Sequence, residues 1–356
     1  MSGTINITSG GGADRLRFIK SHYNHDTPWT GGAATSATTR RTSNSPNEVE
    51  VKVDTVSLKL ITQTTLDLNT AGSWDTISGT DYTTAANRAG KDFYVYACQP
   101  ASGTIPVIKL SAASTYPSDY NAATSRKIAG FHCLCTAVGT ISNHTLTDYL
   151  AGDVLPQSVW DLKFRPVCNP EGMVYSPLAD VWVDIYLASG TGASTLSVKG
   201  GTISDTRTWN SFVDDGAAVK KRLLDDGEFQ IIAAGSNSAT NISGSGDPAT
   251  TGGHSDTAAR RMISNIGCED CAGAMWQWLS DQSYLNHATT YNGTWSWKDM
   301  GAGQLYSQGA VGDVKLIAGG DWSNGTNCGP RSRIANYSRW FATSAIGARF
   351  AARSKT

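Results

Sequence analysis

The chain has 356 residues, of which 40% are hydrophobic and 17% are charged, and its formal net charge is −1. This length allows two or three domains with cores of their own. A charge so near zero argues against a surface for nucleic acid or for an anionic membrane. With 37 glycines and few charges, the composition favours short strands and turns over long helices.

The N-terminal residues contain no apolar segment of the kind found in a secretory signal, and no apolar run approaches the ~20 residues of a membrane helix. We therefore expect no membrane insertion. Residues 26–48 are rich in Ser, Thr and Gly and have no hydrophobic period. This composition is typical of a linker, so we expect residues 1–48 to form an N-terminal arm and linker.

Alternation of apolar and polar residues begins at Val49 and slips by one residue at Asp54-Thr55, which predicts two strands with a turn or a bulge between them. The segments 91–98 and 104–110 predict further strands. These short strands carry little charge that would protect their edges, which favours pairing between chains. Residues 49–157 are therefore expected to form an all-β, prism-like or sandwich-like oligomerisation region.

A second block, residues 158–356, mixes strands with helices. The segment VWVDIYLA, residues 181–188, alternates as a strand does, and two helices are expected between residues 209 and 235. Together with the preceding region, this pattern predicts a β-rich α+β chain.

The second of these helices has a predicted start and stop. Asp225 and Glu228 have the spacing of a capping box, and Gly235 is a suitable C-terminal stop. The polar loop that follows, residues 235–258, is long enough to indicate that it carries function or covers another element.

Two pairs of tryptophans follow the loop. Trp276 and Trp278 fall on one side of a predicted strand, and Trp295 and Trp297 fall on one side of the next. We favour a large aromatic core, and a stacking platform for sugar is the alternative.

No nucleophile motif with catalytic spacing occurs, and the six histidines are scattered. Cys268 and Cys271 have CxxC spacing, but no second ligand pair follows, so buried free thiols are favoured over a zinc site. We expect no required cofactor. A structural calcium ion is the open alternative, for which the oxygen ligands would come from Glu269, Asp270, Asp281 and Asp299.

Seven segments occur in the same order as in a known family, namely VWDLKFRP, PEGM, VWVDIYLASG, KKRLLDDGEFQIIAAG, AMWQW, LIAGGDW and GARF, between residues 159 and 350. SRKIAGFH, residues 125–132, precedes them. On these segments the last part of the chain, from about residue 125, resembles the phage tropism determinants. These are receptor-binding tail proteins that a retroelement diversifies.

The resemblance implies a C-type lectin-like domain over residues 158–356 and a homotrimer. It implies an adhesin and not an enzyme, located at the tip of a virion tail if a phage encodes it and otherwise displayed outside the cell. Its partner would be a receptor on a host cell surface, either protein or glycan. Calcium-dependent sugar binding is not expected, because the E-P-N or Q-P-D ligand triplet is absent.

The formylglycine-generating, sulfatase-modifying oxidases share this lectin-like fold and supply the alternative function. Their copper-dependent oxidation needs two reactive cysteines after the glycine pair. Here Cys328 lies near the second of these positions, but Asn324 stands at the first. The missing thiol argues against the oxidase. A purely structural component of a virion is a third hypothesis.

The segment 319–350 is the expected binding site, because its mixture of small polar residues, aromatics and arginines has no period and resembles antibody loops. A plain irregular surface loop is the alternative. The family's diversified positions, expected to be exposed on a static backbone, fall on Asp321, Ser323, Gly325, Asn327, Ile334, Asn336, Tyr337, Phe341, Thr343, Ala345 and Ile346. For Gly325, Ala345 and Ile346, burial is the open alternative. The scaffold positions are Gly319, Gly320, Trp322, Arg331, Gly347 and Arg349. Both of these arginines are expected to donate fixed forks of hydrogen bonds.

Overall fold

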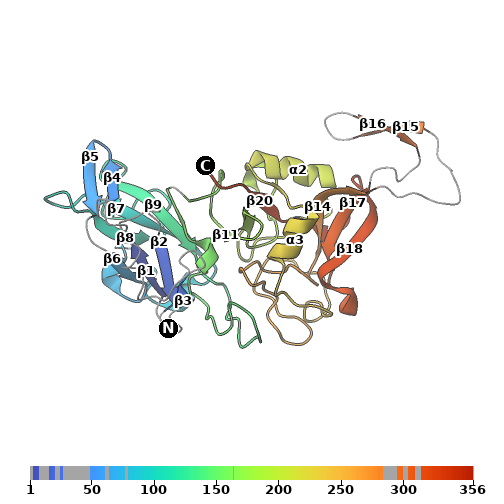
Figure 1. Cartoon of the computed structure of the whole chain (residues 1–356), viewed down its shortest axis with the longest axis horizontal. Coiled ribbons are helices and arrows are strands. Elements are labelled where there is room, and N and C mark those ends of the chain that lie inside the picture. Colours follow the sequence, from blue (N-terminus) through green and yellow to red (C-terminus); the bar gives the residue numbers. More distant parts are fainter. Residues whose placement is uncertain are drawn as a thin grey trace. The chain divides into compact units, whose positions relative to one another are not determined.

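The structure is a computed structural model of the chain, and it describes residues 3–7, 16–20, 25–26, 49–60, 64–76, 79–162, 164–283, 295–299, 304–308 and 314–355. The chain divides into two compact units (Figure 1). The N-terminal unit consists of Met1–Ala137, Asp148–Arg165 and Ser354–Thr356, and the C-terminal unit consists of Val138–Thr147 and Pro166–Arg353. Among the described residues, we find no helix with the length and hydropathy needed to span a bilayer.

The N-terminal unit contains two four-stranded antiparallel sheets and a hairpin. Their strand orders are β3-β2-β1-β6 and β10-β9-β7-β8, and β4 pairs with β5 in the hairpin. The strands are β1 (Gly3–Ile7), β2 (Leu16–Lys20), β3 (His25–Asp26), β4 (Val49–Val53), β5 (Val56–Leu60), β6 (Thr64–Asp67), β7 (Asp92–Cys98), β8 (Val107–Ser111), β9 (Ser125–His132) and β10 (Trp160–Asp161). One apolar core joins residues of β4 to β9, including Val53, Leu66 and Phe93.

The predicted β-rich character of this unit is confirmed. The slip at Asp54-Thr55 is a two-residue turn, since Val53 pairs directly with Val56 and Asp54 has φ +51°, a conformation that Asp tolerates better than most residues. The first 26 residues contribute β1, β2 and β3, so this part of the expected arm joins a sheet. The expected linker, residues 27–48, lies outside the described residues.

The C-terminal unit contains two further four-stranded sheets, with the orders β11-β12-β20-β13 and β18-β17-β14-β19. A two-stranded hairpin, β15-β16, lies between β14 and β17 in the chain. The strands are β11 (Met173–Ser176), β12 (Val181–Asp184), β13 (Arg222–Leu223), β14 (Trp276–Ser283), β15 (Trp295–Asp299), β16 (Gln304–Gln308), β17 (Val314–Gly319), β18 (Gly329–Ser338), β19 (Ile346–Gly347) and β20 (Phe350–Ala352).

Two helices accompany these sheets, α2 (Trp209–Ala218) and α3 (Asp226–Ile232) (Figure 1). The predicted capping box of α3 is confirmed: the Glu228 N–H donates to Asp225 Oδ1 at 2.7 Å, and the Asp225 N–H donates to Glu228 Oε2 at 3.0 Å. This exchange satisfies amides that the first turn leaves without partners. The helix buries Phe229 and Ile232, as its apolar spacing predicts.

The tryptophans of β14 lie in the core of the C-terminal unit. Trp276 and Trp278 are buried in one cluster with Ile317, Ile346 and Phe350, so the predicted aromatic core is confirmed for this pair. The side chains of the second pair, Trp295 and Trp297, lie outside the described residues.

The boundary between the units falls at Arg165/Pro166 rather than after residue 157. The reason is that Trp160 and Asp161 of β10 pair with Gly130 and Ala129 of β9. Residues 138–147 group with the C-terminal unit through backbone and side-chain bonds, among them His144 Nε2 to the Ile263 carbonyl at 3.2 Å.

Candidate functional site

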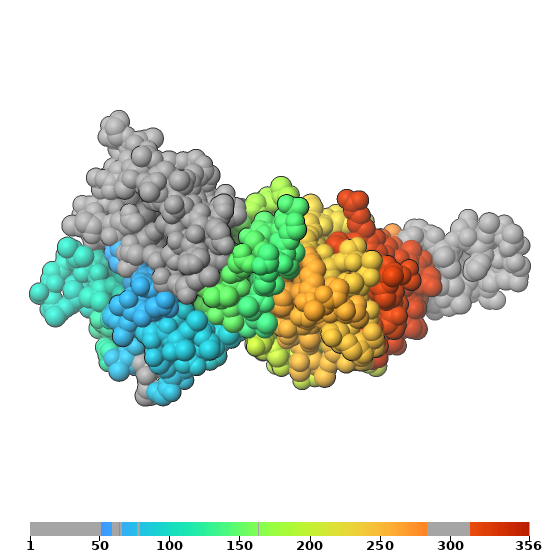
Figure 2. Space-filling model, turned by 90° about the horizontal axis from the view of Figure 1, so that it is seen from below, coloured from blue at the N-terminus to red at the C-terminus, as the bar shows by residue number. Residues whose placement is uncertain are grey.

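The candidate site is the segment that leaves β17, runs along β18 and returns to the sheet through β19. β18 lies at one edge of its sheet, next to β17, and β19 pairs in parallel with β14. Figure 2 shows the chain from residue 314 onward, in red, at the surface of the C-terminal unit. Both ends of the segment therefore belong to the same sheet.

Two consecutive glycines begin the segment, and the backbone there accepts no other residue without strain. Gly319 and Gly320 have φ values of +100° and +94°. A Cβ atom would lie 2.4 Å from the Cys271 carbonyl oxygen at Gly319 and 2.8 Å from Cys328 Sγ at Gly320. The close approach and the positive φ together explain why this bracket needs glycine.

Trp322 anchors the start of the loop. Its ring is half-buried and packs against two apolar clusters, one with Met275 and one with Met262. Its carbonyl accepts a hydrogen bond from Asn241 Nδ2. At the other end of the segment, a Cβ atom on Gly347 would lie 2.6 Å from Met275 Sδ.

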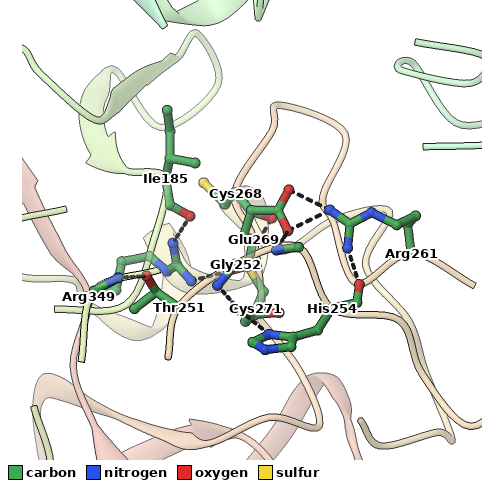
Figure 3. A network of polar contacts seen from close by, with 12 residues as sticks. Ile185, Thr251, Gly252, His254, Arg261, Cys268, Glu269, Cys271 and Arg349 are labelled. Carbon is green, nitrogen blue, oxygen red and sulfur yellow. Dashed lines mark hydrogen bonds and ion pairs between the residues drawn. The ribbon is translucent and has the colours of Figure 1, made fainter. Parts of the chain in front are cut away.

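Arg349 secures the end of the segment through the network that Figure 3 shows. The side chain is fully buried, and its Nη1 donates to the carbonyls of Asp184 (2.7 Å) and Ile185 (2.5 Å). Nη2 donates to the Glu269 carbonyl, and Nε donates to Gln277 Oε1 at 3.1 Å. The expected fork of hydrogen bonds is confirmed for this arginine.

Arg331 does not have the same role, and here the sequence-based expectation is wrong. Its side chain is exposed, and no described residue forms a hydrogen bond or an ion pair with it. Arg333 holds β18 instead. Its Nε pairs with Asp226 Oδ1 at the start of α3, and its guanidinium lies 5.0 Å from the centre of the Phe229 ring.

The acidic residues proposed for calcium are engaged elsewhere. Glu269 forms an ion pair with Arg261, with both carboxylate oxygens 2.7 Å from Nη2 (Figure 3). Asp270 Oδ2 lies 2.9 Å from His254 Nδ1. Asp281 accepts a hydrogen bond from the Asp226 N–H. In the described part of the chain, no three acidic, histidine or cysteine side chains converge as a metal site.

The thiols of Cys268 and Cys271 are both buried, as expected for free cysteines of a core. The side chain of Asp299, the fourth residue of the proposed calcium set, lies outside the described ones.

The eleven predicted contact residues differ in exposure. Ser323, Asn327, Asn336 and Phe341 are exposed, whereas five are half-buried, namely Gly325, Ile334, Tyr337, Thr343 and Ala345. Asp321 and Ile346 are 8% and 1% exposed, so the expectation of exposure is wrong for Asp321, and for Ile346 the alternative of burial is correct.

The burial of Asp321 and Ile346 has a local cause in each case. The Asp321 carboxylate accepts hydrogen bonds from the N–H (2.8 Å) and the hydroxyl (2.7 Å) of Ser323 and so closes a turn within the loop. Ile346 pairs with Trp276 and enters the aromatic cluster of the core.

A β-bulge aims the middle of β18 outward. Ile334 pairs with Ile317 and Tyr337 pairs with Lys315, so two residues of β18 lie opposite one residue of β17. The two residues at this irregularity, Ala335 and Asn336, are both exposed. A bulge bends its strand and redirects side chains, which accounts for the exposure of Asn336.

Aromatic rings stack where β18 ends. The Tyr337 and Phe341 rings lie 4.3 Å apart between centroids with an interplanar angle of 16°, and the Phe341 N–H donates to the Ser338 carbonyl at 2.9 Å. Tyr337 also packs against the core cluster, so the pair joins an exposed ring to a fixed one.

Three residues outside the predicted set support this turn, and sequence reasoning missed them. Two cations contact the Trp209 ring, with Lys315 Nζ 4.3 Å and the Arg339 guanidinium 4.9 Å from its centroid. The Trp209 N–H donates to the Arg339 carbonyl at 3.1 Å. Trp209 is 130 positions from Arg339 in the chain, so no sequence pattern joins the two.

The polar loop 235–258 covers the start of the candidate site, as one of its two predicted roles requires. The Ala239 N–H donates to the Cys328 carbonyl at 2.8 Å, and Asn241 binds the Trp322 carbonyl. Burial and the nearby carboxylates of Asp205 and Asp321 raise the pKa of Asp247 in the same loop.

The position of Cys328 does not favour redox chemistry. Its thiol is buried and donates to the Asp321 carbonyl at 3.3 Å, and burial raises its pKa to about 11. Because the thiolate is the reactive form, this thiol is a poor nucleophile and a poor copper ligand near neutral pH. Asn324, at the place of the other cysteine, accepts a hydrogen bond from the Asp321 N–H at 2.8 Å.

Comparison with known proteins gives relatives along most of the chain. A family model described as the Mtd second domain matches residues 41–161. The tail fiber receptor-binding protein of Bordetella phage BPP-1 is 28% identical over 294 residues, which cover 76% of this chain and 73% of that protein. The likeness therefore begins well before residue 125, where the sequence motifs start.

Solved structures agree in fold. The Major Tropism Determinant P3c variant has a TM-score of 0.67 at 24% identity, and the U1 variant has a TM-score of 0.65 at 23% identity. Each alignment covers 88% of this chain and 82% of the other. By sequence and by fold, the chain thus resembles the phage tropism determinants, and it has their C-type lectin-like fold.

Proposed function

We propose that this protein is a receptor-binding adhesin of a phage tail and that the surface formed by β18 and its flanking turns contacts the receptor. The observation that carries the proposal is the contrast between a fixed backbone and exposed side chains. Strained glycines, Trp322 and Arg349 hold both ends of the segment, whereas Asn336 and Phe341 project from it.

The names of the relatives support the same role. The curated relative is a tail fiber receptor-binding protein, and the structural neighbours are variants of a tropism determinant. A binding role also agrees with the absence of the first oxidase cysteine at Asn324. We therefore propose binding, and not catalysis, as the activity of this surface.

The exposed residues fit a small interface with an aromatic centre. Phe341, stacked on Tyr337, presents apolar area that is already held in place, so its contact with a receptor loses little conformational freedom. Ser323, Asn327 and Asn336 add short donors and acceptors that can adapt to a protein or a glycan. Substitutions at these positions change the contact chemistry without changing the core.

We further propose that the chain acts as a homotrimer at the tip of a virion tail. The resemblance to tropism determinants and the short strands of the N-terminal unit, which leave sheet edges open for pairing, support this assembly. Three linked sites would raise the apparent affinity of weak single contacts, because a released site rebinds at high local concentration. Light scattering at micromolar concentration checks the assembly, and a monomer mass would contradict it.

The test of the binding surface uses the labelled full chain and a panel of bacterial isolates, with binding measured by flow cytometry. We expect the double variant Asn336→Ala/Phe341→Ala to lose at least tenfold in binding to any isolate that the wild type binds, since aromatic anchors dominate small interfaces. Its melting temperature should change little, because exposed substitutions usually alter stability by within ~0.5 kcal/mol.

The matched control is Tyr116→Ala, which removes an aromatic ring of the N-terminal unit that is 44% exposed, close to the 38% of Phe341. It should bind as the wild type does. Equal binding by the double variant and the wild type would contradict the proposal. So would a large drop in the melting temperature of the double variant, since the residues would then belong to the core.

A further inference from the structure

Strand β18 pairs irregularly with β17 at a second place, close to the glycine bracket. Two successive residues of β17 pair with Gly329 and Arg333, so residues 330–332 of β18 have no partner on β17. Extra residues on one strand form a bulge, which bends the strand and redirects its side chains. Of the three residues in this bulge, only Arg331 is exposed.

Hydrogen bonds fix the backbone of the bulge on both sides of Arg331. The Arg333 guanidinium donates from Nη1 to the carbonyls of Pro330 (3.0 Å) and Ser332 (2.8 Å). The Ser332 hydroxyl donates to the Asn327 carbonyl. A side chain on a backbone that is already held loses less conformational freedom when it binds a partner.

The Arg331 guanidinium has no partner among the described residues. It is also the only exposed charged group in the segment from residue 319 to residue 346, because Asp321 and Arg339 are buried and Arg333 is half-buried. All of its N–H donors are therefore available to a molecule outside the chain.

Other charges beside the segment are already engaged within the protein. Arg333 Nε pairs with Asp226 Oδ1. Asp247, which is exposed in the covering loop, accepts a hydrogen bond from the side chain of Ser344 near the end of the segment. The bulge thus presents an unpaired positive charge on a chain whose formal net charge is −1.

We propose that Arg331 is a receptor contact outside the expected diversified set and that its guanidinium fork binds the carboxylate of an acidic side chain on a receptor protein. This inference rests on the proposed function of the β18 surface. A guanidinium presents its donors in a plane that matches a carboxylate, and it is more weakly hydrated than an ammonium group. Because Arg331 is not an expected diversified position, the demand for an acidic group stays constant while neighbouring contacts vary.

The residue types on this surface favour a protein as the partner. Arginine and aromatic residues dominate the contacts that contribute most to protein–protein binding, and β18 and its turn supply Arg331 together with the stacked Tyr337 and Phe341. An acidic glycan is the alternative that the experiment has to exclude.

The test measures binding of the labelled full chain by flow cytometry to a bacterial isolate that the wild type binds. Arg331→Gln should bind at least tenfold more weakly, and Arg331→Lys, which keeps the charge without the planar fork, should recover only part of the loss. Arg126→Gln, the same substitution at an exposed position of the N-terminal unit, is the matched control and should bind as the wild type does. Wild-type binding by Arg331→Gln or by Arg331→Lys overturns the proposal, and so does an equal loss in Arg126→Gln.

Two further measurements identify the partner chemistry. Added sodium chloride should weaken the binding of the wild type more steeply than that of Arg331→Gln, since salt screens an exposed ion pair. Treatment of the isolate with proteinase K should abolish wild-type binding. Equal salt dependence overturns the proposal, and so does binding that survives the proteinase but is lost after periodate oxidation of the cell-surface glycans.

The same assay separates this inference from the proposed function. If Asn336→Ala/Phe341→Ala loses binding and Arg331→Gln does not, only the role of Arg331 is overturned. If the double variant keeps full binding, the proposed surface itself is wrong. The melting temperature of each Arg331 variant should stay near that of the wild type, because the side chain is exposed.

Discussion

Replacement of Arg349 by methionine tests whether the end of the candidate segment depends on buried hydrogen bonds. Methionine is an unbranched side chain of similar reach, but it donates no hydrogen bond. Arg349 donates to four acceptors, the carbonyls of Asp184, Ile185 and Glu269 and the side chain of Gln277. Loss of the four bonds at ~1 kcal/mol each predicts a decrease of about 4 kcal/mol in the free energy of unfolding.

For a unit of about 200 residues, such as the C-terminal unit, each kcal/mol lowers the melting temperature by roughly 2–4 °C. We therefore expect Arg349→Met to lower the melting temperature of this unit by about 8–16 °C, measured by near-UV circular dichroism.

Arg331→Met is the matched control, because its arginine is exposed and has no partner among the described residues. It should change the free energy of unfolding by less than ~0.5 kcal/mol. A melting temperature of Arg349→Met within about 2 °C of the wild type would refute the assigned role of this arginine. Equal shifts in the two variants would refute it as well.

Three other tests have expected outcomes. Asp225→Ala removes the capping box of α3 and should lower the free energy of unfolding by ~1 kcal/mol in a denaturant titration; no loss would contradict the cap. Gly320→Ala should destabilise the protein more than Gly325→Ala in the same titration. Both glycines have positive φ, but only the first would bring a Cβ atom within 2.8 Å of a neighbour. Burial lowers the pKa of His144. The stability that the neutral side chain contributes to the folded protein is therefore present above the unfolded pKa of ~6.5 and is lost as the pH falls through the folded pKa. Burial by itself would lower the pKa of His254, but the hydrogen bond and the charge of Asp270 outweigh burial and raise this pKa. The stability that charged His254 contributes to the folded protein is present below pH ~6.5 and is lost as the pH rises through the folded pKa. The difference in melting temperature from the wild type should therefore shrink in acid for His144→Gln and in alkali for His254→Gln. A difference that shrinks in the opposite direction would contradict the assignment for that histidine.

Features that depend on neighbours within a few positions could be predicted from the sequence. The turn at Asp54-Thr55 and the capping box of Asp225 and Glu228 are examples, because each is complete within four residues. The bracket of Gly319 and Gly320 belongs to the same class, since a backbone with φ near +100° strongly favours glycine. The C-type lectin-like fold was predicted because the sequence motifs occur in the same order as in the phage tropism determinants.

The roles of the individual residues between the brackets were decided by the tertiary structure. Arg331 and Arg333 are two positions apart and chemically identical, yet only Arg333 meets the start of α3, because the irregular pairing of β17 with β18 selects the side chain that faces the helix. Asp321 and Ile346 are buried through contacts with a turn and with the aromatic core. Arg349 finds acceptors 72 to 165 positions away in the chain. The sequence alone determines which residue types are available to the site, and the packing of distant elements decides which of them reach solvent.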